Sequence, residues 1–149
     1  MKYNPVVSFK ASFPHEQAEG SPAGRELAEH LVQILKARGL GVTGPDDHDG
    51  YAWDVNWLEG RSGLMAVVQY VGDDPEEWLI ETHSPSVPFL TRGRSELARQ
   101  RVNLVRRFCE ALHELLSGDA RVGEIRWYSK DQVYEVWSEL PADALNRFG

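Results

Sequence analysis

Residues 51–57 read Tyr-Ala-Trp-Asp-Val-Asn-Trp, with large apolar side chains at the odd positions and the polar Asp54 and Asn56 between them. Strict alternation of this kind is typical of a β-strand that has one buried face and one solvated face. Two tryptophans on one short strand supply much of the buried area of a small domain. The stretch therefore predicts a strand in the middle of a sheet, with Trp53 and Trp57 turned inward and Asp54 turned outward.

The composition is that of an ordinary globular domain. With 149 residues, 42% hydrophobic and 26% charged, the chain is long enough for one domain with its own core, which we place at 1–149. No apolar run approaches the roughly 20 residues that span a bilayer. Residues 1–10 lack the apolar core of a secretory signal. Since Cys109 is the single cysteine, an internal disulfide is excluded, and we expect a cytoplasmic protein.

Charge is distributed unevenly along the chain. The formal net charge of −7 argues against binding to nucleic acid or to an anionic membrane, because both require a positive surface. Residues 46–81 contain ten acids and one base, whereas residues 92–107 contain six arginines and one acid. The simplest interpretation is a set of acidic hairpin loops and a solvated helix face. The alternative is an acidic surface that attracts a basic partner.

Two helices are predicted to cover the sheet. Apolar residues at i, i+3, i+4 and i+7 spacing from Leu27 to Leu35 predict the first helix, with Ser21 as its N-cap and Gly39 at its end. Pro22 would be its first helical residue. A second helix is expected over 95–117, with Ser95 as its N-cap.

Strands are expected over 6–13, 51–58, 64–71, 78–83 and 123–128, with a further short strand over 40–43 and a polar loop over 44–50. Short connections between consecutive strands favour antiparallel pairing. Residues 129–132 resemble a capping box, which favours a short closing helix whose apolar side would be Val133, Tyr134, Trp137 and Leu140. A continued strand through Val133, Glu135 and Trp137 competes with that helix. We therefore expect an α+β fold: a two-layer sandwich with a mostly antiparallel sheet of five to six strands, two main helices on one face and a short C-terminal helix.

Acidic and polar side chains form the candidate sites. Residues 46–49, Asp-Asp-His-Asp, are oxygen-rich, but their spacing fits no calcium loop, so a solvated turn is the simpler interpretation. Asp54 could form an acid–base pair with Glu81 across the sheet, with Asn56 and His83 as neighbours. Such residues more often only keep an exposed face soluble.

Catalytic signatures are missing from the sequence. Ser84 lies in no nucleophile elbow, and no HExxH segment is present. Cys109 lies beside the apolar stripe of the second helix, which predicts burial. Arg101 falls inside that stripe, where it either extends its head group to solvent or forms a buried ion pair. We predict no catalytic residue, metal or cofactor.

In overall plan the chain resembles the small acidic α+β proteins that bacteria use as immunity partners of toxins. The likeness covers the one-sided helix over 21–38, the strand over 51–57 and the acidic loops. It implies an acidic surface that covers a basic active site. The sequence thus predicts a non-enzymatic protein that binds a basic protein partner. The predicted binding residues are Asp46, Asp47, Asp49, Asp54, Asn56, Asp73, Asp74, Glu81 and His83.

Two other functions remain open from the sequence. One is a small-molecule-binding protein or small enzyme that uses the exposed sheet face around Asp54 and Glu81. The other is a structural role as a homodimer that associates through exposed sheet aromatics.

Overall fold

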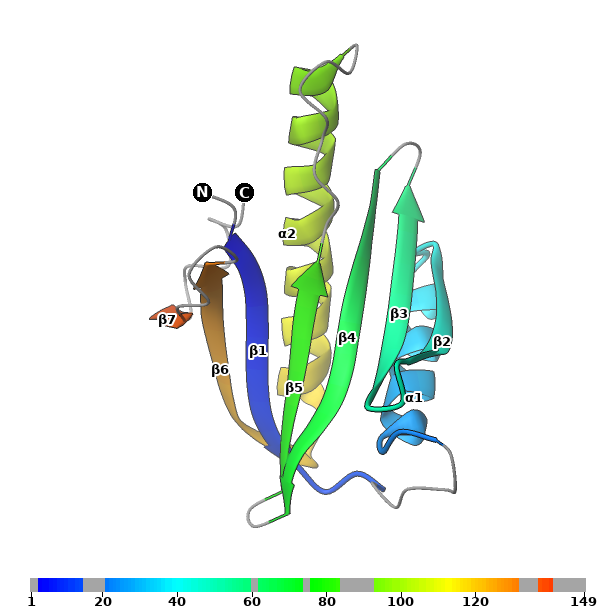
Figure 1. The fold of residues 1–149 in the computed structure, drawn as a ribbon, viewed down its shortest axis with the longest axis vertical. Coiled ribbons are helices and arrows are strands. Elements are labelled where there is room, and N and C mark those ends of the chain that lie inside the picture. The colour runs from blue at the N-terminus through cyan, green and yellow to red at the C-terminus, as the bar shows by residue number, and fades with distance from the viewer. Residues whose placement is uncertain are drawn as a thin grey trace.

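The computed structural model describes residues 3–14, 21–59, 62–73, 76–83, 93–131 and 137–140. Within them lie seven strands and two helices (Figure 1). The elements are β1 Tyr3–Ala11, α1 Arg25–Ala37, β2 Val42–His48, β3 Ala52–Glu59, β4 Ser62–Asp73, β5 Glu76–His83, α2 Arg94–Gly118, β6 Val122–Asp131 and β7 Trp137–Leu140. The strands form one antiparallel sheet in the order β2-β3-β4-β5-β1-β6-β7.

The predicted two-layer sandwich with five to six strands and a C-terminal helix is wrong. The sheet has seven strands, and residues 137–140, expected on a closing helix, form β7 against β6. Residues 132–136 of that expected helix lie outside the described residues. The capping-box pattern misled because β6 continues through Asp131, which pairs with Tyr3 of β1. Sheet pairing here outweighs a local helix signal.

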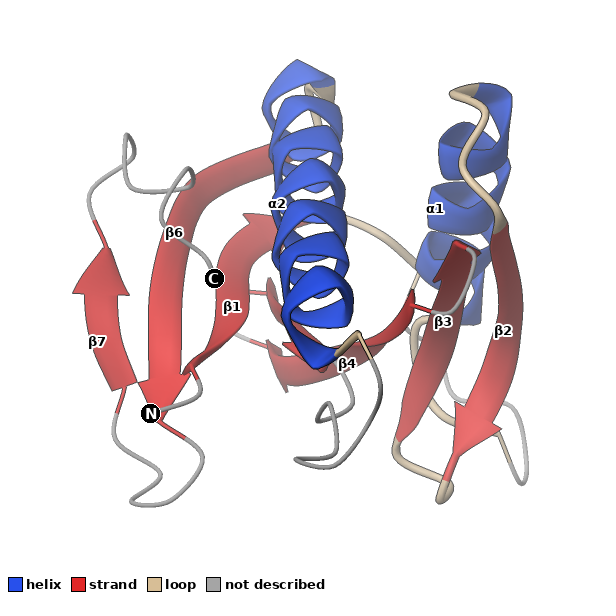
Figure 2. Ribbon diagram, turned by 90° about the horizontal axis from the view of Figure 1, so that it is seen from above, coloured by secondary structure: helices blue, strands red, loops and turns tan. Residues whose placement is uncertain are grey.

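Both helices lie on one side of the curved sheet (Figure 2). Helix α1 packs against β2 and β3, and α2 packs against β4 and β6. The prediction for the aromatic strand is confirmed, because Trp53 and Trp57 are 6% and 1% exposed and face the helices. The Trp57 ring lies 5.9 Å from that of Phe108 on α2. Tyr51 is exposed and precedes β3, so the buried side of the alternation begins at Trp53 and not at Tyr51.

The two predicted N-caps are wrong. Helix α1 begins at Arg25 and α2 at Arg94, each after a left-handed glycine, Gly24 or Gly93, that makes no side-chain cap. Pro22 lies outside α1, where its carbonyl accepts a hydrogen bond of 3.2 Å from Trp53 Nε1. The start of α1 is therefore fixed by contacts with the sheet.

The polar loop predicted over 44–50 is also wrong, because most of it belongs to β2, an edge strand. Its pairing with β3 shifts register between Thr43 and Asp46, so that Pro45 lies in a bulge. Proline is tolerated at such places because it has no N–H to donate to the sheet.

Candidate functional site

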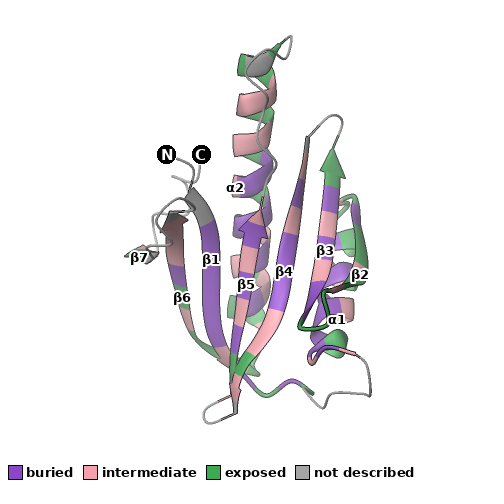
Figure 3. Cartoon of the chain, in the orientation of Figure 1, coloured by how far each residue is buried: buried purple, intermediate pink, exposed green. Residues whose placement is uncertain are grey.

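One face of the sheet is not covered by α1 or α2, and we call it the open face (Figure 3). Paired residues on neighbouring strands point to the same side, so one row of this face runs through Asp54, Val67, Glu81 and Val6. Val67 and Val6 are 2% and 0% exposed. The charged members of the row thus stand among buried aliphatic side chains, in a setting less polar than bulk water.

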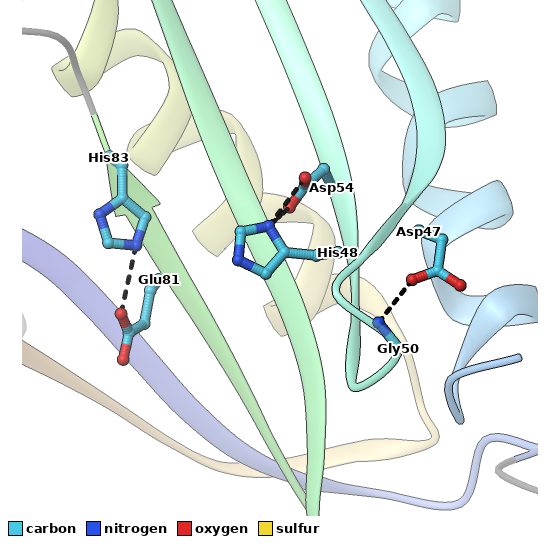
Figure 4. Close-up of polar contacts among 6 residues, drawn as sticks. All are labelled: Asp47, His48, Gly50, Asp54, Glu81 and His83. Carbon is cyan, nitrogen blue, oxygen red and sulfur yellow. Dashed lines mark hydrogen bonds and ion pairs between the residues drawn. The ribbon is translucent and has the colours of Figure 1, made fainter.

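Asp54 is held by a histidine from the edge strand (Figure 4). His48 Nδ1 lies 2.9 Å from Asp54 Oδ2 and 2.8 Å from Oδ1. The Asp54 side chain is 14% exposed, so it does not extend freely into solvent as we predicted. The His48 ring also contacts Tyr51 edge to face, at 5.2 Å between centroids. The contact between His48 and Asp54 therefore joins β2 to β3 on the open face.

Glu81 is held by a histidine and a lysine. Its Oε2 lies 3.2 Å from His83 Nε2 (Figure 4). Its Oε1 lies 3.6 Å from Lys130 Nζ. The hydrogen bond to His83 lowers the pKa of Glu81, and the charge of Lys130 lowers it further, although burial acts in the opposite direction. Glu81 is therefore an ionised carboxylate at neutral pH.

The predicted acid–base pair does not form. Asp54 and Glu81 share a row, but Val67 of β4 stands between them, which puts their Cα atoms about 10 Å apart, or two strand spacings. A general acid also needs a raised pKa, whereas that of Glu81 is lowered. Each carboxylate instead contacts its own neighbours, His48 for Asp54 and His83 with Lys130 for Glu81.

The acids of residues 46–49 spread over β2 and the following turn. Asp47 Oδ1 accepts a hydrogen bond of 2.7 Å from the backbone N–H of Gly50, and Asp49 adopts a left-handed backbone with φ of 51°. Asp46, Asp47 and Asp49 are exposed, and none forms an ion pair within the described ranges. No group of three His, Cys, Asp or Glu side chains suited to a metal ion occurs in the described part of the chain.

The other described acids of 46–81 are distributed over both ends of the sheet. Asp73 is the last residue of β4, and Asp74 falls outside the described residues. The β2–β3 turn and the end of β4 lie at the same end of the sheet because the strands alternate in direction (Figure 1). Glu59 lies at the other end, where Arg107 of α2 binds its carboxylate at 2.8 and 2.9 Å. The described acids of 46–81 therefore do not form one continuous surface.

A cavity of about 620 Å³ opens on the end of the open face opposite those turns. Thr43, Asn56, Met65 and His83 form a single row across four strands and line it. The remaining described lining residues are Trp57, Leu58, Gly63 and Leu64. Sequence reasoning identified Asn56 and His83 but missed Thr43, Leu58 and Met65. Thr43 fell within the strand predicted over 40–43, but the register that sets it opposite Asn56 could not be predicted from the pattern.

Two further findings bear on function. Neither helix in the described residues is both long and apolar enough to cross a membrane. Comparison of the chain with family models, with curated proteins and with solved structures gave no match.

Proposed function

We propose that the protein is a non-enzymatic binding protein that docks a basic protein partner through its acidic edge, defined as Asp46, Asp47 and Asp49 on β2 and its turn. One observation carries the proposal: these exposed carboxylates have no cationic partner among the described residues. By contrast, Glu59 forms an ion pair with Arg107, Glu81 lies against His83 and Lys130, and Asp54 lies against His48. The acidic edge thus presents three neighbouring exposed carboxylates without a described counter-ion.

The partner class that we propose is a toxin domain with a basic active site, encountered in the cytoplasm. The support is the overall plan described from the sequence and the position of the acidic edge. Carboxylates on an exposed edge attract a cationic surface over long distances and speed the encounter. An acidic protein seated on such a site would exclude substrate without any chemistry of its own.

The test is the affinity of a purified basic partner, recovered from the native host and measured by titration calorimetry at several salt concentrations. Asp46→Asn/Asp49→Asn removes two charges and suits the local backbone, since asparagine tolerates the left-handed conformation of Asp49. At about 0.5–1 kcal/mol per exposed charge pair, we expect affinity to fall about 5- to 30-fold.

The matched control is Glu110→Gln/Glu139→Gln, which removes two exposed charges from α2 and β7. We expect it to leave affinity within about twofold. Binding that is insensitive to salt, or equal losses in the two double variants, would contradict docking through the acidic edge.

A second candidate function is small-molecule binding on the open face, and the cavity beside Asn56 and His83 favours it. Its volume of about 620 Å³ falls within the range of small-ligand sites, roughly 300–1,000 Å³. In this candidate function the ligand would contact the row that contains Asn56 and His83. Asp54 and Glu81 already contact their own partners within the protein.

A further inference from the structure

The cavity on the open face is built by four adjacent strands. Thr43 of β2 pairs with Asn56 of β3, Asn56 with Met65 of β4, and Met65 with His83 of β5. These four side chains therefore form a straight row about 14 Å long, or three strand spacings. Because the row lies within a hydrogen-bonded sheet, its residues keep a fixed spacing without a bound ligand.

The polar groups of the cavity are uncharged or already balanced. No Asp, Glu, Lys or Arg occurs among the described residues that line it. Its histidine, His83, is held through Nε2 by the carboxylate of Glu81. Asn56 makes no side-chain hydrogen bond within the described part of the chain. An asparagine carboxamide offers two donors and one acceptor, so it matches a group that presents both an acceptor and a donor.

The other side of the cavity is apolar. Leu58 is 72% exposed, and its side chain lies over Gly63, where an added Cβ would come within 2.9 Å of Leu58 Cδ2. Met65 lines the same cavity next to Leu58. Exposed leucine and a thioether together suit a flat apolar or aromatic body. A charged ligand would find no described counter-ion here.

We propose that this cavity binds an uncharged aromatic carboxamide, with the amide of the ligand paired to Asn56 and its ring against Leu58 and Met65. The proposal rests on the second candidate function and is independent of docking through the acidic edge. The amide-to-amide pairing supplies selectivity, because a site built around a donor and an acceptor rejects analogues that lack either. The ring covers the exposed leucine.

The probes are benzamide, acetophenone and benzoate, titrated into the full-length protein at pH 7 and followed by amide chemical shifts. Acetophenone keeps the ring and the carbonyl acceptor but lacks the N–H donors, and benzoate replaces the amide by a charge. We expect saturable shifts with benzamide at residues 43, 56, 65 and 83, and at least about tenfold weaker binding of both analogues.

Two variants and one control complete the test. Asn56→Leu and Leu58→Ser are each expected to weaken benzamide binding about tenfold or more. Gln69→Leu makes the same change as Asn56→Leu on the same face but outside the cavity, and should leave binding unchanged. Leu58 is exposed, so Leu58→Ser keeps the test decisive even if Asn56→Leu fails to fold.

Absence of saturable shifts with benzamide would overturn the proposal. Equal binding of benzamide and acetophenone, or equal losses in Asn56→Leu and Gln69→Leu, would also overturn it. None of these variants alters the acidic edge. Failure here would therefore leave partner docking standing, and failure of partner docking would leave this result unaffected.

Discussion

Substitution of Gly24 tests how the start of α1 packs against the sheet. Gly24 is the N-cap of α1, with φ of 91°, and a Cβ added to it would come within 2.5 Å of Trp78 Cζ3. Trp78 cannot easily move aside, because it is fully buried and its Nε1 donates a hydrogen bond of 3.1 Å to the carbonyl of Ala11. Gly24→Ala therefore combines a strained backbone with a steric clash.

The two costs can be separated with a second glycine. Gly39, at the other end of α1, has φ of 81°, but an added Cβ would meet nothing within 4 Å. Gly39→Ala should cost only the left-handed backbone penalty, about 1–2 kcal/mol. Gly24→Ala should cost that amount plus about 1–3 kcal/mol for overpacking in a full core.

Urea unfolding at 25 °C, followed by tryptophan fluorescence, measures both variants. With a slope of about 1–3 kcal/mol per molar urea, an extra 2 kcal/mol moves the midpoint by roughly 1 M. We expect Gly24→Ala to unfold at clearly lower urea than Gly39→Ala. If the two variants lose the same free energy of unfolding, Gly24 does not lie against Trp78 and the described start of α1 is incorrect.

Two further predictions concern titratable groups. The pKa of Glu81 is lowered in the folded protein by His83 and Lys130, so its contribution to stability is present above the unfolded pKa and is lost as pH falls through the folded pKa. In acid-unfolding titrations, the free energy of unfolding of Glu81→Gln should therefore fall less than that of the wild type between about pH 5 and pH 3. An equal fall in the two proteins would refute this. Cys109 is fully buried, and this burial raises the pKa of its thiol. It should react with a thiol-specific disulfide reagent only as the protein unfolds, and rapid modification of the native protein would contradict its burial.

The fold could be predicted from sequence where the pattern was local. The alternation over 51–57 placed Trp53 and Trp57 correctly, because a period of two depends on neighbouring residues alone. The start of β2 fell within the strand predicted over 40–43, but its continuation was missed because Asp46, Asp47 and His48 have little preference for strands and are placed there by pairing with β3. The helix starts were missed because Gly24 and Gly93 adopt their backbone conformations in the context of the tertiary fold.

The candidate site was predicted in part. Asp54, Asn56, Glu81 and His83 do lie on the face that the helices leave uncovered. Their partners could not be predicted, because register between strands decides them. A shift of two residues in β4 or β5 would change which side chains meet across the sheet. The pairing of Asp54 with His48 further required β2 to extend to His48, whereas residues 44–50 were predicted as a polar loop.

Hydrogen–deuterium exchange of the partner complex tests the central claim of a binding protein with an acidic edge most directly. Among the described residues no strand lies beyond the outer side of β2, so exchange of the amides there and in its turn responds to a bound partner. We predict that partner binding slows exchange over residues 42–50 and leaves residues 95–107 of α2 unchanged. Protection over 95–107 with none over 42–50 would contradict the account.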